Sequence, residues 1–262
     1  MLYLCDIIKP LTNRRDKRMN TRQNDILDLL AAQGEMTIKA LAERLGVTEM
    51  TIHRDLDSLG KDGYLYKKRG AAVFIEKPDR GGSMYQNEKR EIGRLAAEHI
   101  KPGQTILFDN STTAIETAKF LSGIPGLTFY TTNIEIAAIV SAYPGTVMYC
   151  SGGYYFPDSK GFVGRQAEEF VSRVKADICV IGASGISVDM GLTNPYPMHT
   201  ALQRKIIEAS DFRLVVADHS KFGKRAMEKA ADLSEIDLIL TDGGIRPDVL
   251  EEYRKYTKIE TT

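Results

Sequence analysis

Residues 47–56, Val-Thr-Glu-Met-Thr-Ile-His-Arg-Asp-Leu, constrain the fold more than any other stretch, because they begin an amphipathic helical pattern. The hydroxyl of Thr48 can accept a hydrogen bond from the free amides of the first turn. Ile52, Leu56 and Leu59 recur at spacings of four and three residues and therefore share one face. The other faces carry Glu49, Met50, His53, Arg54 and Asp57. The pattern predicts a helix that packs on one side and offers polar side chains on the other.

A shorter helix is predicted just upstream. Ile38, Leu41 and Leu45 repeat the same period, and Gly46 can adopt the left-handed backbone that ends a helix in a tight turn. Two helices joined by a short turn form the arrangement that places a second helix in the major groove of DNA. The alternative is a pair of amphipathic helices in an ordinary helical bundle.

The flanking residues complete a small domain. The sequence predicts a first helix over residues 21–32 and a short strand at 35–38. Residues 64–66 and 73–75 then resemble two strands of a hairpin around a basic tip at 67–70, which would form a wing. Cations at this tip can neutralise DNA phosphates, or the segment can be a solvated charged loop. The cations concerned are Lys67, Lys68 and Arg69.

Charge and cysteine usage narrow the class of protein. Residues 1–80 hold 15 Lys and Arg against 12 Asp and Glu, whereas the remainder holds 20 against 23, so the basic excess lies in the first part. Three cysteines without paired spacing indicate neither a disulfide framework nor a zinc site, which fits a cytoplasmic protein. Residues 1–18 do not resemble a secretory signal, and we interpret them as an extension before Met19. No apolar run is long enough to span a membrane.

The domain boundaries follow from composition. Residues 19–76 form the predicted winged helix-turn-helix domain, and residues 77–88, rich in Gly, Pro and Ser near their start, form a linker. Residues 89–262 begin with a helix at 89–99 and continue as alternating apolar runs and amphipathic segments. This alternation predicts an α/β domain with a mostly parallel sheet and helices on both faces. The expected strands are 105–108, 127–130, 147–150, 178–181, 214–217 and 238–240, and the expected helices are 114–121, 134–142, 168–174, 201–209 and 249–256.

Small and polar residues follow each expected strand. Ligands of open parallel sheets bind outside the carboxyl ends of the strands, so these residues predict one pocket formed by five or six converging loops. The loop after the first strand, Asp-Asn-Ser-Thr-Thr, offers hydroxyl groups and free amides that suit a phosphate. The loops are residues 109–113, 131–133, 151–153, 182–185, 218–222 and 241–242.

These motifs together resemble the DeoR family of bacterial transcriptional regulators. In the first domain the match is carried by Thr48, Thr51, Ile52, His53, Arg54, Asp55 and Leu56. In the second it is carried by the loops above together with Gly161, Gly164, residues 191–193 and residues 218–222. The resemblance implies a winged helix-turn-helix that binds operator DNA and a sugar-phosphate-isomerase-like domain that senses a phosphorylated sugar or a related metabolite.

The resemblance also assigns site residues. The expected DNA contacts are Thr48, Glu49, Met50, Thr51, His53, Arg54, Lys67, Lys68 and Arg69. The expected effector contacts are Asp109, Ser111, Thr112, Thr113, Asn133, Gly153, Asp218 and Lys221. The sequence departs from the family pattern at His53, where most relatives have arginine, and at Ser111, where glycine is commonest. It departs again at residues 198–200 and 203–204, so the selective part of the pocket is expected to differ.

Several effector candidates have simpler alternatives. Thr112 and Asn133 can each cap the helix that follows, because both residue types are good caps. Asp218 and Lys221 can pair as a surface ion pair of little energetic value. His199 and His219 lack a ligand cluster at metal spacing, so we expect no metal and no cofactor.

The remaining alternatives concern turnover. A sugar-phosphate isomerase needs a carboxylate as general base, and enzymes similar in fold carry acidic residues after the strand that corresponds to 178–181. This chain has Gly-Ala-Ser-Gly there, and the next carboxylate, Asp189, is several residues away. We therefore expect a repressor that forms a homodimer or homotetramer on repeated DNA sites and is not an enzyme. An isomerase with a DNA-binding appendage and a plain interaction scaffold are the alternatives.

Overall fold

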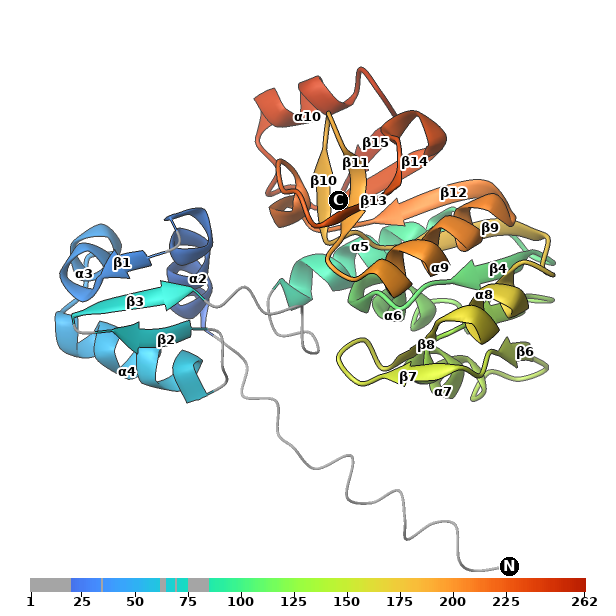
Figure 1. Ribbon diagram of the computed structural model, residues 1–262, viewed down its shortest axis with the longest axis horizontal. Helices are drawn as coiled ribbons and strands as arrows, with labels where there is room; N and C mark the ends of the chain where they lie inside the picture. Colours follow the sequence, from blue (N-terminus) through green and yellow to red (C-terminus); the bar gives the residue numbers. More distant parts are fainter. Residues whose placement is uncertain (1–19, 34, 62–64, 69, 75–84) are drawn as a thin grey trace, which may run out of the picture. The chain divides into compact units, whose positions relative to one another are not determined.

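The computed structural model describes residues 20–33, 35–61, 65–68, 70–74 and 85–262, and it divides the chain into two units, 1–77 and 78–262 (Figure 1). The expected extension at residues 1–18, the expected DNA contact Arg69 and most of the expected linker lie outside the described residues.

The described part of the first unit contains three helices and a small antiparallel sheet. The helices are α2 (Thr21–Gln33), α3 (Ile38–Leu45) and α4 (Glu49–Lys61), and the sheet, in the order β1-β3-β2, contains β1 (Glu35–Thr37), β2 (Leu65–Lys68) and β3 (Ala71–Phe74). Gly46 ends α3 with a φ of 65°, as predicted for the turn between the two helices. Ile52, Leu56 and Leu59 are 0% exposed and form the buried face of α4. The expected helix-turn-helix and its buried face are therefore confirmed.

The hairpin differs from the expected wing in one respect. Lys67 pairs with Ala72 and Lys68 with Ala71 across the two strands. Lys67 and Lys68 consequently belong to strand β2, and the prediction that they form the tip was wrong. Strand pairing extended further toward the turn than the basic run suggested, because lysine side chains tolerate an exposed edge strand.

The second unit is built on a seven-stranded parallel sheet in the order β15-β14-β12-β9-β4-β5-β6. All six predicted strands are present, and the seventh was missed because it is short and lies near the end of the chain. The strands are β4 (Thr105–Phe108), β5 (Thr128–Thr131), β6 (Val147–Cys150), β9 (Ala176–Ile181), β12 (Ser210–Val216), β14 (Leu238–Thr241) and β15 (Ile259–Thr261).

Helices cover both faces of this sheet, as expected. One core contains the buried residues of α5 (Gln86–Glu98), α6 (Thr112–Ala118) and α7 (Ile134–Val140). The other core contains those of α8 (Arg165–Val171), α9 (Pro197–Glu208) and α10 (Pro247–Tyr253). Alternate strand residues point to opposite faces. For example, Phe108 packs in the first core and its neighbour Leu107 in the second.

Five short strands were not predicted. β7 (Tyr154–Phe156) and β8 (Gly161–Val163) form a hairpin, and β10 (Gly185–Ser187), β11 (Gly191–Asn194) and β13 (Glu228–Ala231) form a three-stranded sheet. Single backbone bridges join these elements to loops of the main sheet, from Asn133 to Gly161 and from Ile186 to Phe222. The short strands therefore cover the carboxyl end of the parallel sheet, where the effector loops were expected.

Candidate functional site

The start of α4 presents the expected DNA-facing side chains to solvent. Thr48 caps the helix, because its Oγ1 accepts a hydrogen bond from the Thr51 backbone N–H at 3.3 Å, and the two hydroxyl groups lie 3.0 Å apart. Glu49, His53 and Arg54 are exposed, and Met50 is 66% exposed. The predicted DNA contacts on this helix are thus accessible, and their role in DNA binding stays a prediction.

Asp55 fixes the position of α4, the second helix of the helix-turn-helix, which is called the reading helix below. Its carboxylate accepts a hydrogen bond from Arg22 Nε at 2.6 Å, and its side chain is only 7% exposed. This pair joins α2 to α4. Sequence reasoning included Asp55 only as part of the motif. Its position three residues after the buried Ile52 and one before the buried Leu56 is the signal that could have indicated an inward side chain.

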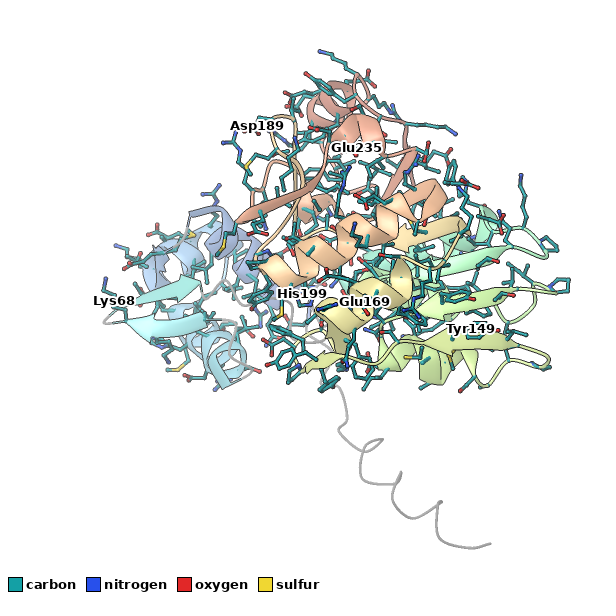
Figure 2. The ribbon with its side chains drawn as sticks, turned by 45° about the vertical axis from the view of Figure 1, so that its right-hand side comes forward. Lys68, Tyr149, Glu169, Asp189, His199 and Glu235 are labelled. Carbon is teal, nitrogen blue, oxygen red and sulfur yellow. The ribbon has the colours of Figure 1, made fainter. Side chains whose placement is uncertain are left out.

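The two described cations of the wing are already paired with carboxylates. Lys67 Nζ lies 2.5 Å from Asp57 Oδ1, and Lys68 Nζ lies 3.4 Å from Glu35 Oε2. All four side chains are at least one-third exposed, and Lys68 projects from the first unit (Figure 2). Exposed pairs of this kind are weak, so DNA phosphates can compete for both lysines.

Asp109, the first expected effector residue, is buried in a hydrogen-bond network. Its Oδ2 accepts bonds from the Gly182 N–H at 2.8 Å and from Gln203 Nε2 at 3.2 Å, and its Oδ1 accepts a bond from the Ser111 N–H at 2.9 Å. Burial raises the pKa of this carboxyl, while the donors act in the opposite direction. Gln203 also donates to the Gly182 carbonyl at 2.7 Å. Asp109 therefore joins the loop after β4 to the loop after β9 and to α9.

Two glycines allow this close approach. A Cβ on Gly182 would lie 2.3 Å from the Ser111 Cβ, and a Cβ on Gly161 would lie 2.2 Å from the Asn110 side chain. Asn110 in turn accepts a hydrogen bond from the Thr132 hydroxyl at 2.7 Å. The loops after β4, β5 and β9 and the β7–β8 hairpin are thus packed against one another.

The hydroxyl-rich loop after β4 differs from the alternative in which Thr112 caps the following helix. Ser111 is the N-cap of α6, because its Oγ accepts a hydrogen bond from the Ala114 N–H at 3.2 Å. Thr112 is the first residue of the helix, so the alternative that Thr112 caps it was wrong by one position. Ser111 and Thr112 are half-buried and Thr113 is 5% exposed. Contact of these three residues with an effector stays a prediction.

Asn133 performs the capping role that was its alternative. Its Oδ1 accepts hydrogen bonds from the backbone N–H groups of Glu135 at 2.8 Å and Ile136 at 3.1 Å, at the start of α7. Its Nδ2 donates to the Ser159 carbonyl at 2.9 Å, and the residue is 0% exposed. The side chain amide is therefore committed to the protein, and an effector contact stays a prediction.

His199, one of the departures from the family pattern, lies at the start of α9 against the β7–β8 hairpin (Figure 2). Its Nε2 is 3.0 Å from Ser159 Oγ, and its ring meets that of Phe156 edge to face with centroids 4.8 Å apart. Burial lowers its pKa, so the neutral ring is favoured. Its Nδ1 is buried without a hydrogen-bond partner in the described part of the chain.

Asp218 lies at the end of β12 and is 0% exposed. Its Oδ1 accepts a hydrogen bond from the Ser220 N–H at 3.1 Å, within the turn that includes the half-buried Lys221. The alternative of a surface ion pair between Asp218 and Lys221 was therefore wrong, because a carboxylate that is fully buried is not at the surface. Its Oδ2 and the Thr241 Oγ1 of β14 are buried and lack hydrogen-bond partners in the described residues.

The expectation of one pocket for all the loops was too broad. In the observed strand order, β14 and β6 are five positions apart, which corresponds to about 24 Å at the usual strand spacing. The loops after these two strands do not line one pocket of the size of a sugar phosphate. Gly153, after β6, has a φ of 139° and approaches the Val163 carbonyl, so it serves the packing of the β7–β8 hairpin.

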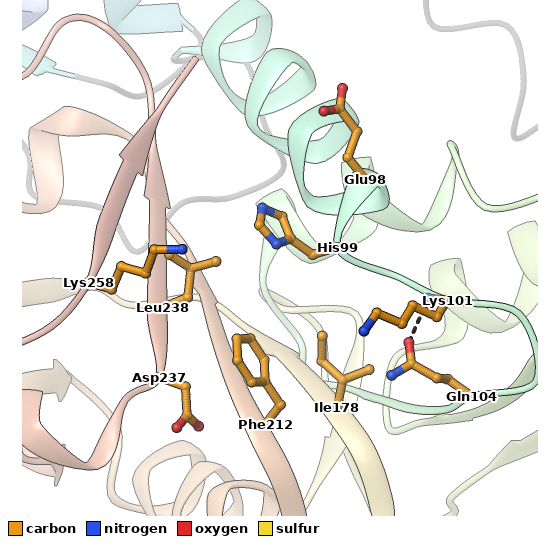
Figure 3. Close-up of a pocket in the computed structure, with 9 residues that line it drawn as sticks. All are labelled: Glu98, His99, Lys101, Gln104, Ile178, Phe212, Asp237, Leu238 and Lys258. Carbon is orange, nitrogen blue, oxygen red and sulfur yellow. Dashed lines mark hydrogen bonds between the residues drawn. The ribbon is translucent and has the colours of Figure 1, made fainter.

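A cavity of about 410 Å³ opens at the opposite end of the sheet (Figure 3). Ile178, Phe212 and Leu238 form its apolar wall near the amino ends of β9, β12 and β14. Two of its lining side chains share one carboxylate: Lys258 Nζ lies 2.6 Å from Glu260 Oε1, and His99 Nε2 lies 3.0 Å from Glu260 Oε2. The cavity therefore lies away from every expected effector residue.

Two further expectations concern metals and membranes. Among the residues that the structure describes, no three His, Cys, Asp or Glu side chains gather as a possible metal site. Within the same residues, no helix is both long and apolar enough to cross a bilayer. Cys150 and Cys179 are free thiols.

Comparison with known proteins identifies the chain by both of its units. Residues 22–78 match the model of the DeoR-like helix-turn-helix domain, and residues 84–243 match that of the DeoR C terminal sensor domain. The chain is 33% identical over 232 residues to the transcriptional repressor AccR of Agrobacterium fabrum, which covers 86% of this chain and 90% of that protein. It is 30% identical over 230 residues to the glycerol-3-phosphate regulon repressor of Escherichia coli, with 86% and 91% covered.

Among solved structures, ribose 5-phosphate isomerase A of Methanocaldococcus jannaschii is similar over 53% of this chain and 55% of that chain, with a TM-score of 0.39 and 15% identity. The two matched models cover most of this chain, in the order and at the positions of the two units described above. The resemblance expected from the sequence is thereby confirmed: the chain belongs to the DeoR family of DNA-binding transcriptional regulators, with a helix-turn-helix domain followed by a sensor domain.

Proposed function

We propose that this protein is a repressor that binds repeated operator sites as a homodimer or homotetramer and releases them when its sensor domain binds a phosphorylated sugar or polyol. The observation that carries the proposal is the combination, in one chain, of a reading helix with an exposed polar face and a sheet domain with polar loops at the carboxyl ends of its strands. Paired reading helices on one oligomer match a repeated operator and multiply its affinity.

The exposed start of α4 supports base reading. Arg54 can donate two hydrogen bonds to guanine or one to a phosphate, and the exposed Met50 side chain can contact a thymine methyl group. His53 offers a ring nitrogen where relatives offer a guanidinium, so it forms at most one directed hydrogen bond per ring nitrogen. We expect Thr48, Glu49 and Thr51 to contact DNA near the helix start, and Lys67 and Lys68 to leave their carboxylate partners for phosphates.

The sensor domain has unsatisfied polar atoms where a hydroxylated ligand would bind. Asp218 Oδ2 and Thr241 Oγ1 are both buried without partners in the described residues, at the ends of the adjacent strands β12 and β14. Buried polar atoms of this kind are uncommon and are usually satisfied by water or a ligand. A carboxylate and a hydroxyl suit ligand hydroxyl groups, while the loop of Ser111, Thr112 and Thr113 suits a phosphate. The name of the Escherichia coli relative supports a phosphorylated polyol as the first ligand to test.

Binding without turnover fits the surroundings of the carboxylates. The nearest carboxylate after β9 is Asp189, in the turn between β10 and β11, and it is half-exposed and paired with Arg225 at 3.0 Å. Asp189 already has an ion-pair partner, and both oxygens of Asp109 accept hydrogen bonds from the protein. These arrangements favour a sensor over an isomerase, which is the second candidate for the sheet domain.

A ligand screen on the full chain tests the proposal. We expect a thermal shift with sn-glycerol 3-phosphate, D-ribose 5-phosphate or another sugar phosphate, and no aldose–ketose interconversion of the same compounds. Thr112→Asp places a negative charge at the expected phosphate position and should remove the shift while sparing DNA binding. Ser172→Asp, which adds the same charge on the exposed end of α8, is the control. Turnover of any ligand would overturn the sensor assignment, and an unchanged shift in Thr112→Asp would remove that loop from the site.

A further inference from the structure

Tyr85, the first described residue of the second unit, has a backbone conformation that its side chain disfavours. Its φ of 54° and ψ of 34° are left-handed, and it is one of two non-glycine residues with positive φ in the described chain. A left-handed conformation is unfavourable for a residue with a Cβ and persists only where the surroundings impose it. The residue is 7% exposed, so the surroundings in question are packing contacts.

The ring of His219 supplies such a contact. The rings of Tyr85 and His219 meet edge to face, with centroids 4.9 Å apart and an interplanar angle of 79°. The Tyr85 carbonyl also accepts a hydrogen bond from the Lys89 N–H at 2.8 Å and so begins α5. One residue therefore fixes both the start of α5 and a contact with the loop after β12.

His219 is itself bound to Asp242. Its backbone N–H donates to Asp242 Oδ1 at 2.8 Å, and its Nδ1 lies 2.7 Å from Asp242 Oδ2. Burial acts against the ionised form of Asp242, but the hydrogen bonds from His219 outweigh it and lower the pKa of this carboxyl. A Cβ on Gly244 would lie 2.5 Å from His219 Nδ1, so glycine is required beside the ring. A movement of the loop after β12 would therefore move the ring of His219 with it.

The same loop begins with one of the unsatisfied polar atoms. Asp218, which precedes His219 directly, has a buried Oδ2 without a partner in the described residues, and Thr241 Oγ1 on the adjacent strand shares that property. A ligand hydroxyl bound to these atoms would lie one residue from the group that contacts Tyr85. A ligand bound to Asp218 is therefore separated from Tyr85 only by His219, the next residue in the chain.

We propose that the Tyr85–His219 contact transmits effector binding at the ends of β12 and β14 to the start of α5, and that the affinity for DNA depends on this contact. This inference rests on the proposed function, because it names how the same site is regulated. A ligand that binds one conformation of the 218–222 turn more tightly increases the population of that conformation, and Tyr85 follows through its contact with His219. If this changes the affinity for DNA by some factor, DNA must change the affinity for the ligand by the same factor. The strained backbone of Tyr85 provides the alternative state, since loss of the ring contact lets the residue relax.

The test uses the full chain and four variants. Tyr85→Gly removes the ring and accepts the left-handed backbone without cost, Tyr85→Ala removes the ring but keeps a Cβ that disfavours this backbone, and His219→Ala removes the other partner. Tyr143→Ala is the control, because its ring forms a similar edge contact with Phe129, with centroids 6.4 Å apart, in a different part of the sensor unit. Either Tyr85 variant keeps the test valid if His219→Ala fails to fold.

The first measurement is hydrogen exchange without ligand. We expect His219→Ala to accelerate exchange at the amide of Lys89, and Tyr85→Gly to accelerate exchange at the amides of Lys221 and Gly223, each at least about tenfold. Tyr143→Ala should leave these amides unchanged. Unchanged exchange in both variants would overturn the inference, whatever ligand the protein binds.

The second measurement is the affinity for a promoter fragment that wild type binds, with and without sn-glycerol 3-phosphate or D-ribose 5-phosphate. We expect a ligand to change wild-type affinity within the usual allosteric range of about 5- to 150-fold, and less than twofold in the Tyr85 and His219 variants. The variants should still show the thermal shift. Full coupling in these variants would refute the relay alone, whereas a wild type that binds no sugar phosphate would refute the proposed effector class and leave hydrogen exchange to decide the relay.

Discussion

In the helix-turn-helix unit most of the described side chains expected to contact DNA are exposed. In the sensor unit, by contrast, four of the eight residues expected to contact the effector are buried and the other four are half-buried. Arg54 and Met50 point to solvent from a helix whose other face packs on the core. Asp109 instead accepts a hydrogen bond from the Gly182 N–H in the loop after β9, and Asn133 accepts one from the Glu135 N–H at the start of α7. The difference shows that a polar residue after a strand can serve the folding of its own loop first, and the following experiments test how far that holds.

The largest effect is expected at the packed face of the reading helix. Leu56→Ala removes a side chain that is 0% exposed and should lower the free energy of unfolding of the first unit by about 2–5 kcal/mol. His53→Ala, on the exposed face, should change that free energy by less than about 0.5 kcal/mol. Denaturation followed by circular dichroism measures both. Equal losses would mean that the two faces are not separated as described.

Asp109→Asn tests whether this residue serves the fold. An amide replaces one acceptor oxygen by a donor, so at least one of the N–H groups from Ser111, Gly182 or Gln203 loses its partner. We expect a loss of about 1–3 kcal/mol in the stability of the sensor unit. The affinity for a sugar phosphate that binds wild type should fall by no more than the loss of folded protein explains. Loss of ligand binding without loss of stability would return Asp109 to the effector site.

Arg54→Ala tests the exposed face directly. We expect operator affinity to fall by about 1–3 kcal/mol, roughly 10- to 100-fold, with stability unchanged. Gel-shift titration against operators changed one base at a time distinguishes the two modes of contact. A loss confined to one base indicates guanine recognition, a uniform loss indicates a phosphate contact, and no loss at all removes Arg54 from the DNA surface.

Asp242→Asn tests how the stability contributed by the hydrogen bonds between His219 and Asp242 depends on pH. The pKa of Asp242 is lowered in the folded state, so its contribution to stability is present above the ordinary value of 3.8 and is lost as the pH falls through the lowered value. We expect the variant to be less stable than wild type by about 1 kcal/mol near neutral pH and the gap to close in acid. Urea denaturation at several pH values measures the gap. A gap independent of pH would show that the charge of Asp242 is not what His219 stabilises.

The smallest effect on stability is expected at the wing. Lys67→Ala breaks an exposed ion pair with Asp57 and should change the free energy of unfolding by less than about 1 kcal/mol. If Lys67 binds a phosphate, the slope of log affinity against log salt concentration should decrease by about 0.9. Lys119→Ala, which breaks a pair with Glu116 in the sensor unit, should leave the slope unchanged. An unchanged slope in Lys67→Ala would leave the wing lysine as a solvated charge.

The sequence alone determined the two units, the helix-turn-helix and the parallel order of alternating strands and helices, because each depends on periods of two or 3.6 residues that act within one element. Ile52, Leu56 and Leu59 could be assigned to the core from their spacing alone. Family membership was likewise readable from local motifs.

Only the tertiary structure decided which polar residues are available. The burial of Asp55 depends on Arg22, 33 positions away, and that of Asp109 depends on Gly182 and Gln203, 73 and 94 positions away. The periodicity of hydrophobic residues within one helix or strand does not indicate hydrogen-bond partners at such separations. The strand order separated the loops after β6 and β14, and it brought Asp242 of one loop against His219 of another. Hydrogen bonds between loops form only after the sheet is assembled, and for that reason their pattern is a property of the fold.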